Sequence, residues 1–168
     1  MCNPVDIQGK ILYRWHFREG MRLDVDEPII IPVEPPGRPL DFSECGVGWP
    51  VIHARVARVL EELGVPDLQF FPVTVESHPD EYFILNVTRL VPCVDEARSG
   101  RVVKWTPEDG FPERVGEYKV VRELRIDPAK VGDARMFRPW GWKVLIVSDD
   151  IKEAFERERL LGPKFFEV

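Results

Sequence analysis

Cysteine and histidine are the residues of this chain best suited to chemistry, but their spacing assigns them none. Cys93 is followed by Asp95 and Glu96, whereas a reactive thiol needs a neighbouring base or cation to ionise. The three histidines form no pair at metal-ligand spacing; they are His16, His53 and His78. We therefore expect a buried structural cysteine, no metal, no cofactor and no enzyme activity.

Two short motifs resemble functional signatures but lack their context. Gly46-Val47-Gly48 has neither the third glycine nor the helix of a phosphate-binding loop, so we interpret it as a turn. Asn86-Val87-Thr88 fits the glycosylation pattern, yet it lies inside a predicted strand. Carboxylates are numerous, but spacing singles out no pair for acid–base catalysis. A hydrolase remains a third alternative, and its site would need Cys93 or a histidine brought within reach of a carboxylate by folding.

Length and composition favour one globular domain over residues 1–168. A chain of this size buries about 70% of its unfolded surface, which is enough for a core without disulfides. Cys2, Cys45 and Cys93 are odd in number and widely spaced, which indicates a reducing compartment. No run approaches the ~20 apolar residues of a membrane helix, and the first ten residues lack the apolar core of a leader. We expect a cytoplasmic protein that does not bind membranes, and the sequence leaves its oligomeric state open.

The formal net charge of −6 is concentrated in the first half of the chain. Residues 1–84 hold 14 acidic and 7 basic residues, whereas residues 85–168 hold 15 and 16. Residues 61–81 contain no Lys or Arg, and their acidic residues are Glu61, Glu62, Asp67, Glu76, Asp80 and Glu81. Such a surface repels nucleic acid and speeds the encounter with a basic protein. These six residues are the predicted partner-binding face; the alternative is an ordinary solvated face.

Part of the sequence is repeated. One unit, residues 48–73, begins with Gly-Trp-Pro-Val-Ile and ends with Phe-Phe-Pro-Val. The other, residues 141–168, begins with Gly-Trp-Lys-Val-Leu and ends with Phe-Phe-Glu-Val. Each contains an apolar run, a helix-period segment and a glycine, which predicts a repeated strand–helix–strand structure rather than a catalytic site.

Both units predict an amphipathic helix. In the first unit the apolar stripe lies between residues 54 and 64 and consists of Val56, Val59, Leu60 and Leu63. In the second it consists of Ile151, Ala154 and Phe155. Ser148, before the second helix, is a good N-cap because its hydroxyl can accept a backbone N–H. Its counterpart His53 is predicted to be a poorer cap.

Extended segments complete the predicted fold. Residues 81–91 are rich in aromatic and β-branched side chains, and we expect them to form a central strand. Shorter strands are expected at 11–17, 28–33, 101–105 and 118–126, with a stiff connection at 34–39, a turn-rich loop at 106–112 and one helical turn at 127–130. The predicted fold class is α+β, with a mixed or antiparallel sheet and two packed helices.

The tryptophans beside glycine or proline turns have two interpretations. They are Trp49, Trp105, Trp140 and Trp142. Tryptophan fills cores and also dominates contact surfaces, and we favour the core role. If these turns form a pocket, the chain is a non-catalytic regulatory or ligand-binding module, which is the main alternative function.

Several strings together resemble a family of bacterial immunity proteins. They are Tyr82-Phe83-Ile84-Leu85-Asn86-Val87, Cys93-Val94-Asp95, Ser99, Phe137-Arg138 and Ile146-Val147-Ser148, with the beginnings and ends of the repeat units around them. The family, first noted in myxobacteria, is associated with polymorphic toxins. The likeness runs from Asp41 to Val168, roughly three quarters of the chain, and departs at His53, where the family more often has serine.

This resemblance implies a cytoplasmic protein that binds a cognate toxin and blocks it stoichiometrically without chemistry. Some toxins of such families resemble nucleases, which need basic clefts to engage phosphate. The acidic first half of the chain suits a basic partner of that kind. The family pattern assigns no partner-contacting residues, so the six acidic residues rest on charge alone.

Overall fold

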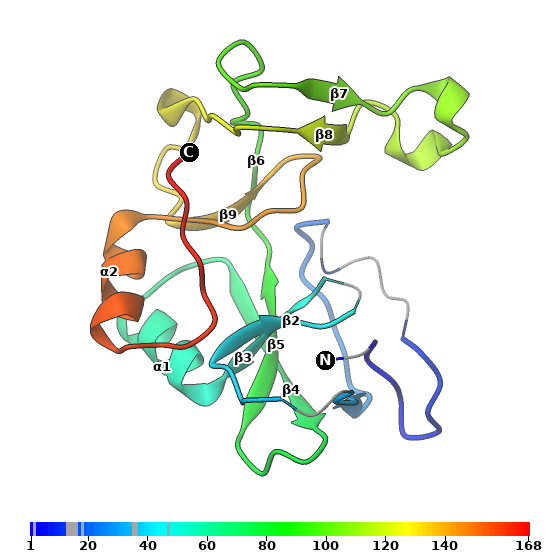
Figure 1. Cartoon of the computed structure of the whole chain (residues 1–168), viewed down its shortest axis with the longest axis vertical. Coiled ribbons are helices and arrows are strands. Elements are labelled where there is room, and N and C mark those ends of the chain that lie inside the picture. Colours follow the sequence, from blue (N-terminus) through cyan, green and yellow to red (C-terminus); the bar gives the residue numbers. More distant parts are fainter. Residues whose placement is uncertain (2, 13–16, 18, 35–36, 47) are drawn as a thin grey trace.

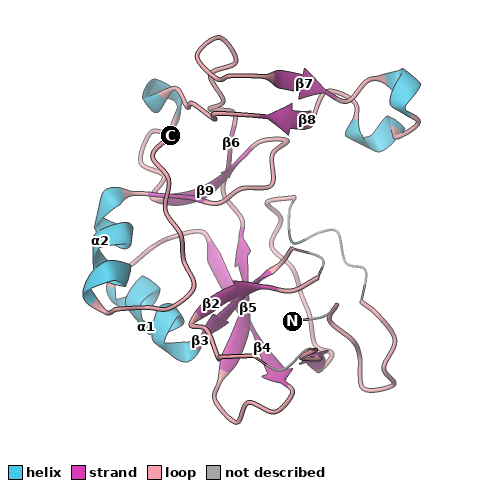
Figure 2. Cartoon of the chain, in the orientation of Figure 1, coloured by secondary structure: helices cyan, strands magenta, loops and turns pink. Residues whose placement is uncertain are grey.

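The computed structural model describes residues 1, 3–12, 17, 19–34, 37–46 and 48–168. Within these residues the chain forms two α-helices and ten short strands in three sheets (Figures 1 and 2). The predicted α+β class, with a mixed sheet and two packed helices, is confirmed. Neither helix in this part of the chain has the length and apolar character that crossing a membrane requires.

The largest sheet has five strands in the order β1-β4-β5-β3-β2. They are β1 (Ile29–Ile31), β2 (Phe42–Glu44), β3 (Pro50–His53), β4 (Leu68–Val75) and β5 (Tyr82–Val87). β1 runs parallel to β4, and the other neighbouring pairs are antiparallel. β5 is the middle strand, as predicted, because its apolar side chains are buried or nearly buried along its length.

The strand predicted over residues 81–91 is interrupted at Thr88 and Arg89. There the chain leaves the five-stranded sheet and β6 (Leu90–Val91) joins a second sheet with β9 (Met136–Pro139) and β10 (Ile146–Val147). β6 runs parallel to β9, and β9 runs antiparallel to β10. One apolar run of the sequence therefore supplies strands to two sheets.

Hydrophobic side chains cover both faces of the five-stranded sheet. On one face, Phe17 of the N-terminal segment and Trp49, which precedes β3, form one hydrophobic cluster with Tyr82 and Ile84. On the other face lie α1 (Ala54–Glu62) and α2 (Asp149–Arg157), whose core residues are Val56, Val59, Leu60, Ile151, Ala154 and Phe155. Figure 1 shows the two helices side by side, on the side of the sheet away from the N-terminal segment. Both predicted helical stripes are confirmed, with Leu63 only partly buried.

The N-caps of the two helices are the reverse of the prediction. His53 Nδ1 accepts a hydrogen bond from the Arg55 amide at 3.1 Å, because a neutral imidazole has one acceptor nitrogen. The Ser148 hydroxyl makes no cap bond to its helix backbone and donates to the Asp150 carboxylate instead. The prediction that His53 is the poorer cap is therefore wrong.

The two repeat units end differently. The first is β3–α1–β4, as predicted, whereas in the second β10 and α2 are followed by coil, so the strand predicted at the end of the chain is wrong. This C-terminal strap, residues 158–168, contacts β2, where the Phe42 amide donates to Leu161 O at 3.0 Å. Phe166 is 84% exposed, whereas Phe71, its counterpart in β4, is buried.

A two-stranded arm projects from the rest of the molecule (Figure 2). It consists of β7 (Val102–Lys104) and β8 (Tyr118–Val121), which pair antiparallel and lie within the predicted strands. Two 3-10 turns, η2 (Pro107–Asp109) and η3 (Pro112–Arg114), occupy the predicted turn-rich loop at its tip. The predicted turn at 127–130 is also present, as η4 (Pro128–Lys130).

The earliest predictions fall partly outside the described residues. Of the strand predicted at 11–17, residues 13–16 lie outside the described residues, and His16 is among them. Ile11 forms an isolated bridge to Val5. Cys2, residues 35 and 36 of the predicted connection, and Val47 also lie outside the described residues. The Gly48 amide donates to Cys45 O at 2.7 Å, which agrees with the predicted turn.

Candidate functional site

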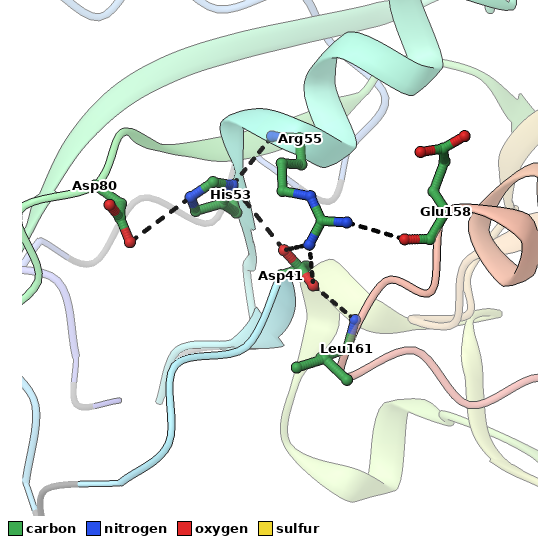
Figure 3. Close-up of polar contacts among 6 residues, drawn as sticks. All are labelled: Asp41, His53, Arg55, Asp80, Glu158 and Leu161. Carbon is green, nitrogen blue, oxygen red and sulfur yellow. Dashed lines mark hydrogen bonds and ion pairs between the residues drawn. The ribbon is translucent and has the colours of Figure 1, made fainter.

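Asp41, His53 and Arg55 form a polar cluster at the start of α1 (Figure 3). Asp41 is 7% exposed, and its carboxylate accepts hydrogen bonds from Arg55 Nη1 at 3.1 Å and the Leu161 amide at 2.7 Å. Arg55 Nη2 also donates to the carbonyl oxygen of Glu158 at 2.9 Å. The cluster therefore attaches the C-terminal strap to β2 and α1.

His53 lies between two carboxylates without forming a catalytic pair. Nδ1 is 4.0 Å from Asp41 and Nε2 is 3.8 Å from Asp80, both beyond hydrogen-bond distance. The Tyr82 ring packs edge-on against the imidazole, 5.1 Å between centroids. Within the described residues no hydrogen bond links the imidazole to a hydroxyl or thiol, so the nucleophile–base arrangement of a hydrolase is not formed there.

Cys93 is fully buried and its thiol is free. Burial raises the pKa of the thiol, which keeps it neutral and unreactive. Its backbone carbonyl accepts the Asp127 amide at 2.7 Å, which links this segment to the one that precedes η4. The predicted structural role of Cys93 is confirmed. Among the residues that the structure describes, no three His, Cys, Asp or Glu side chains are grouped to hold a metal ion.

Glu96 closes the base of the arm. Its carboxylate contacts Lys104 Nζ at 2.7 Å and accepts a hydrogen bond from the Tyr118 hydroxyl at 2.9 Å. The Lys104 and Tyr118 hydrogen bonds lower the pKa of Glu96, while burial and then Glu96 itself raise the pKa of Tyr118 to about 12. Both side chains therefore stay in one protonation state near neutral pH, and the group acts as a clamp.

The six predicted partner-binding residues are all exposed, but they do not form one continuous patch. They are Glu61, Glu62, Asp67, Glu76, Asp80 and Glu81. Asp67 precedes β4 and Glu76 follows it, so this strand of 8 residues separates them, by roughly 30 Å at the rise of extended chain. Asp80 lies beside His53, and Glu62 is in the last turn of α1. The acidic charge is therefore distributed over both ends of β4 and along α1.

Two of the six residues, Glu61 and Glu81, line a shallow pocket of about 200 Å³. The remaining lining residues are Ala54, Ala57, Arg58, Phe70 and Phe83. Phe70 and Phe83 come from neighbouring strands, and their rings meet edge to face with centroids 6.1 Å apart. The pocket is thus lined by two phenylalanines of the sheet and by two glutamates.

The sequence does not identify Phe70 and Phe83 as site residues, because a phenylalanine in a predicted strand is expected to be buried in the core. Both are only partly buried, since the helix above them is short and has alanine at positions 54 and 57. A small side chain on a helix facing aromatic residues on a strand is the signal that could have found the pocket. That signal requires knowing which strand faces the helix.

The four tryptophans near turns differ in their surroundings. Trp49 is 2% exposed, which confirms its core role, whereas Trp140 is 47% exposed. The ring of Trp105 has Arg114 at 4.4 Å and Lys119 at 4.8 Å from its centroid. Tryptophan lines neither the pocket of about 200 Å³ nor a neighbouring one of about 170 Å³.

A comparison with models of protein families identifies the family of the chain. Residues 6–168 match the immunity protein family (Imm11). The chain belongs to this family. The predicted resemblance to immunity proteins is confirmed, and the match extends it from residue 41 to residue 6. No curated protein matches the chain.

Membership of the immunity protein family gives the chain an immunity role, which implies that it binds a cognate toxin. The family match favours a non-catalytic role. Within the described residues, His53 Nδ1 accepts the Arg55 amide and burial raises the pKa of the Cys93 thiol. The surface that binds the toxin is therefore the functional surface that this family role implies.

Proposed function

We propose that the chain neutralises one cognate toxin by binding it stoichiometrically and covering its working surface, without making or breaking bonds. The observation that carries this proposal is the family match over residues 6–168. We place the complex in the cytoplasm, with no role for nucleic acid, membrane or cofactor.

We further propose that the toxin is basic, such as a nuclease. The support is the net charge of −6 and the exposure of all six acidic residues within 61–81. A nuclease must attract phosphate and therefore has a surface of cationic side chains. An acidic protein can bind to that surface. Complementary charge raises the association rate, and this increase becomes smaller as salt screens the charges.

A titration of the toxin tests blocking against catalysis. The purified cognate toxin is assayed while the chain is added in increasing amounts. Blocking predicts that activity falls linearly and reaches its minimum at one equivalent. A catalytic inactivator would instead abolish activity at a small fraction of an equivalent, and that outcome would overturn the proposal.

Salt dependence tests the charge component separately. The association rate constant is measured between 50 and 500 mM NaCl, with the expectation of at least a tenfold decrease, because steered encounters are screened. An association rate that does not change with salt would show that the toxin is not recruited by charge, even where stoichiometric blocking holds.

A further inference from the structure

We propose that the pocket between Glu61 and Glu81 receives an arginine side chain of the toxin and anchors the complex. This inference rests on the proposed function and goes beyond it by assigning one contact and its chemistry. It also divides the six acidic residues into two that bind directly and four that contribute only to the field.

Glu61 and Glu81 line the same pocket because of local structure. Ala54, Ala57, Arg58 and Glu61 lie at i, i+3, i+4 and i+7 and share one face of α1. Glu81 is held at the other end of this face, since its carbonyl oxygen accepts the Ala54 amide at 2.9 Å. The pocket therefore lies along one helix face and is lined by both glutamates.

Neither carboxylate is neutralised within the described part of the chain. Glu61 and Glu81 form no ion pair with another described residue, in contrast to Glu96, which contacts Lys104 at 2.7 Å. A carboxylate that faces a partly enclosed pocket gains more from a cation than one in open water, because screening there is weaker. The site thus calls for a positive charge.

The two phenylalanines determine which cation fits. The Phe70 and Phe83 rings offer apolar area to a long aliphatic stem and a π-face to a cation. Arginine combines such a stem with a planar guanidinium that binds carboxylates through paired hydrogen bonds. The volume of about 200 Å³ is that of a side chain rather than of a larger ligand.

Arg58 also lines the pocket, and its own position leaves room for the incoming cation. It is exposed, and it lines the neighbouring pocket as well, where Glu62 and Glu158 are present. Its side chain can therefore turn toward those two carboxylates when a second guanidinium enters. Arginine from the partner and Arg58 would then occupy adjacent acidic positions.

Two double variants with the same change of charge test the anchor. Glu61→Lys with Glu81→Lys alters the pocket, and Glu76→Lys with Glu153→Lys alters two exposed glutamates outside it. Binding to a catalytically inactive variant of the cognate toxin is measured by surface plasmon resonance at 150 mM NaCl. We expect the pocket variant to raise Kd at least about tenfold, mainly through faster dissociation, and the control to lower only the association rate.

A neutral variant separates the shape of the pocket from its charge. Ala54→Leu lies at a partly exposed position of α1 and fills the pocket without changing the net charge. We expect it also to accelerate dissociation, by about threefold or more. Equal effects of the two charge variants, or normal dissociation of the pocket variants, would overturn the anchor while leaving the immunity role intact. Failure of the unaltered chain to bind this toxin would overturn both.

Discussion

The two repeat units share the order and spacing of their apolar residues but end in different structures. In residues 48–73 the closing Phe-Phe-Pro-Val lies in β4, which has hydrogen-bonded neighbours on both sides. In residues 141–168 the closing Phe-Phe-Glu-Val is coil, with Phe166 84% exposed. The comparison shows that an apolar pattern indicates which side chains a segment can bury. Whether the segment becomes a strand depends on a neighbouring strand whose backbone can hydrogen-bond to it.

The physical cause lies at the point where the second unit reaches the sheet. The C-terminal strap meets β2, the edge strand, through the hydrogen bond from Phe42 to Leu161. Gly162 follows with φ of 112°, a conformation that L side chains rarely adopt and that takes the chain out of strand geometry. The strap therefore covers part of an edge rather than adding a full strand to it.

The largest effect is expected from Gly162→Ala. An added Cβ would lie 1.9 Å from Phe42 O, so the strap must separate from β2 in addition to adopting an unfavourable φ. We expect the free energy of unfolding, measured by urea denaturation, to fall by at least about 2 kcal/mol.

Gly64→Ala is the matched control in the first unit. Gly64 also has a positive φ, of 60°, but no atom lies within 4 Å of the added Cβ. The left-handed backbone alone should cost about 1 kcal/mol. Equal losses at the two glycines would contradict the close contact between the strap and β2.

The two N-caps should differ by a smaller amount. His53→Ala removes the hydrogen bond to the Arg55 amide and should lower stability by about 1 kcal/mol. Ser148→Ala removes no bond to the helix backbone and should cost less than about 0.5 kcal/mol. Thermal unfolding of both variants, with His53→Asn as the conservative replacement, checks the ranking; a larger loss at Ser148 would reverse it.

The smallest effect is a pH dependence at the start of α2. Hydrogen bonds from Ser148, and next from Arg135, lower the pKa of Asp150 below its ordinary value of 3.8. A lowered pKa in the folded state stabilises the protein above the unfolded value, and this contribution disappears as the pH falls through the folded value. The contribution is small because the side chain is 49% exposed.

Asp150→Asn measures that contribution. The variant should unfold at a slightly lower temperature than the unaltered chain at pH 6, and the difference should shrink as the pH falls below 3.8. Scanning calorimetry across this range would record it. A difference in unfolding temperature that stays constant with pH would mean that the charge of Asp150 does not contribute to stability.

Periodic features of the sequence predicted the parts of the fold that depend on burial. The stripes containing Val56 and Ile151, the central position of β5 and the buried Cys93 all follow from side-chain chemistry at fixed spacing. The strand over 81–91 was predicted as one element, and its division at Thr88 was not, because only the second sheet gives Leu90 and Val91 their own partner.

The candidate site was predictable in charge but not in shape. The six acidic residues are recognisable because no Lys or Arg occurs among residues 61–81. That Glu61 and Glu81 share a pocket, while Asp67 and Glu76 lie at opposite ends of β4, depends on how α1 lies across the sheet. The number of acidic residues follows from composition, whereas the packing of α1 on the sheet decides which of them line one pocket.

The sequence by itself determined the acidic character of the first half, the two amphipathic helices and the likeness to immunity proteins. Tertiary structure alone decided that His53 caps α1, that the end of the chain becomes a strap, and that two phenylalanines and two glutamates meet in one pocket. The reason is physical: side-chain polarity and helical period are local, but backbone partners and cavities exist only between segments that folding brings together.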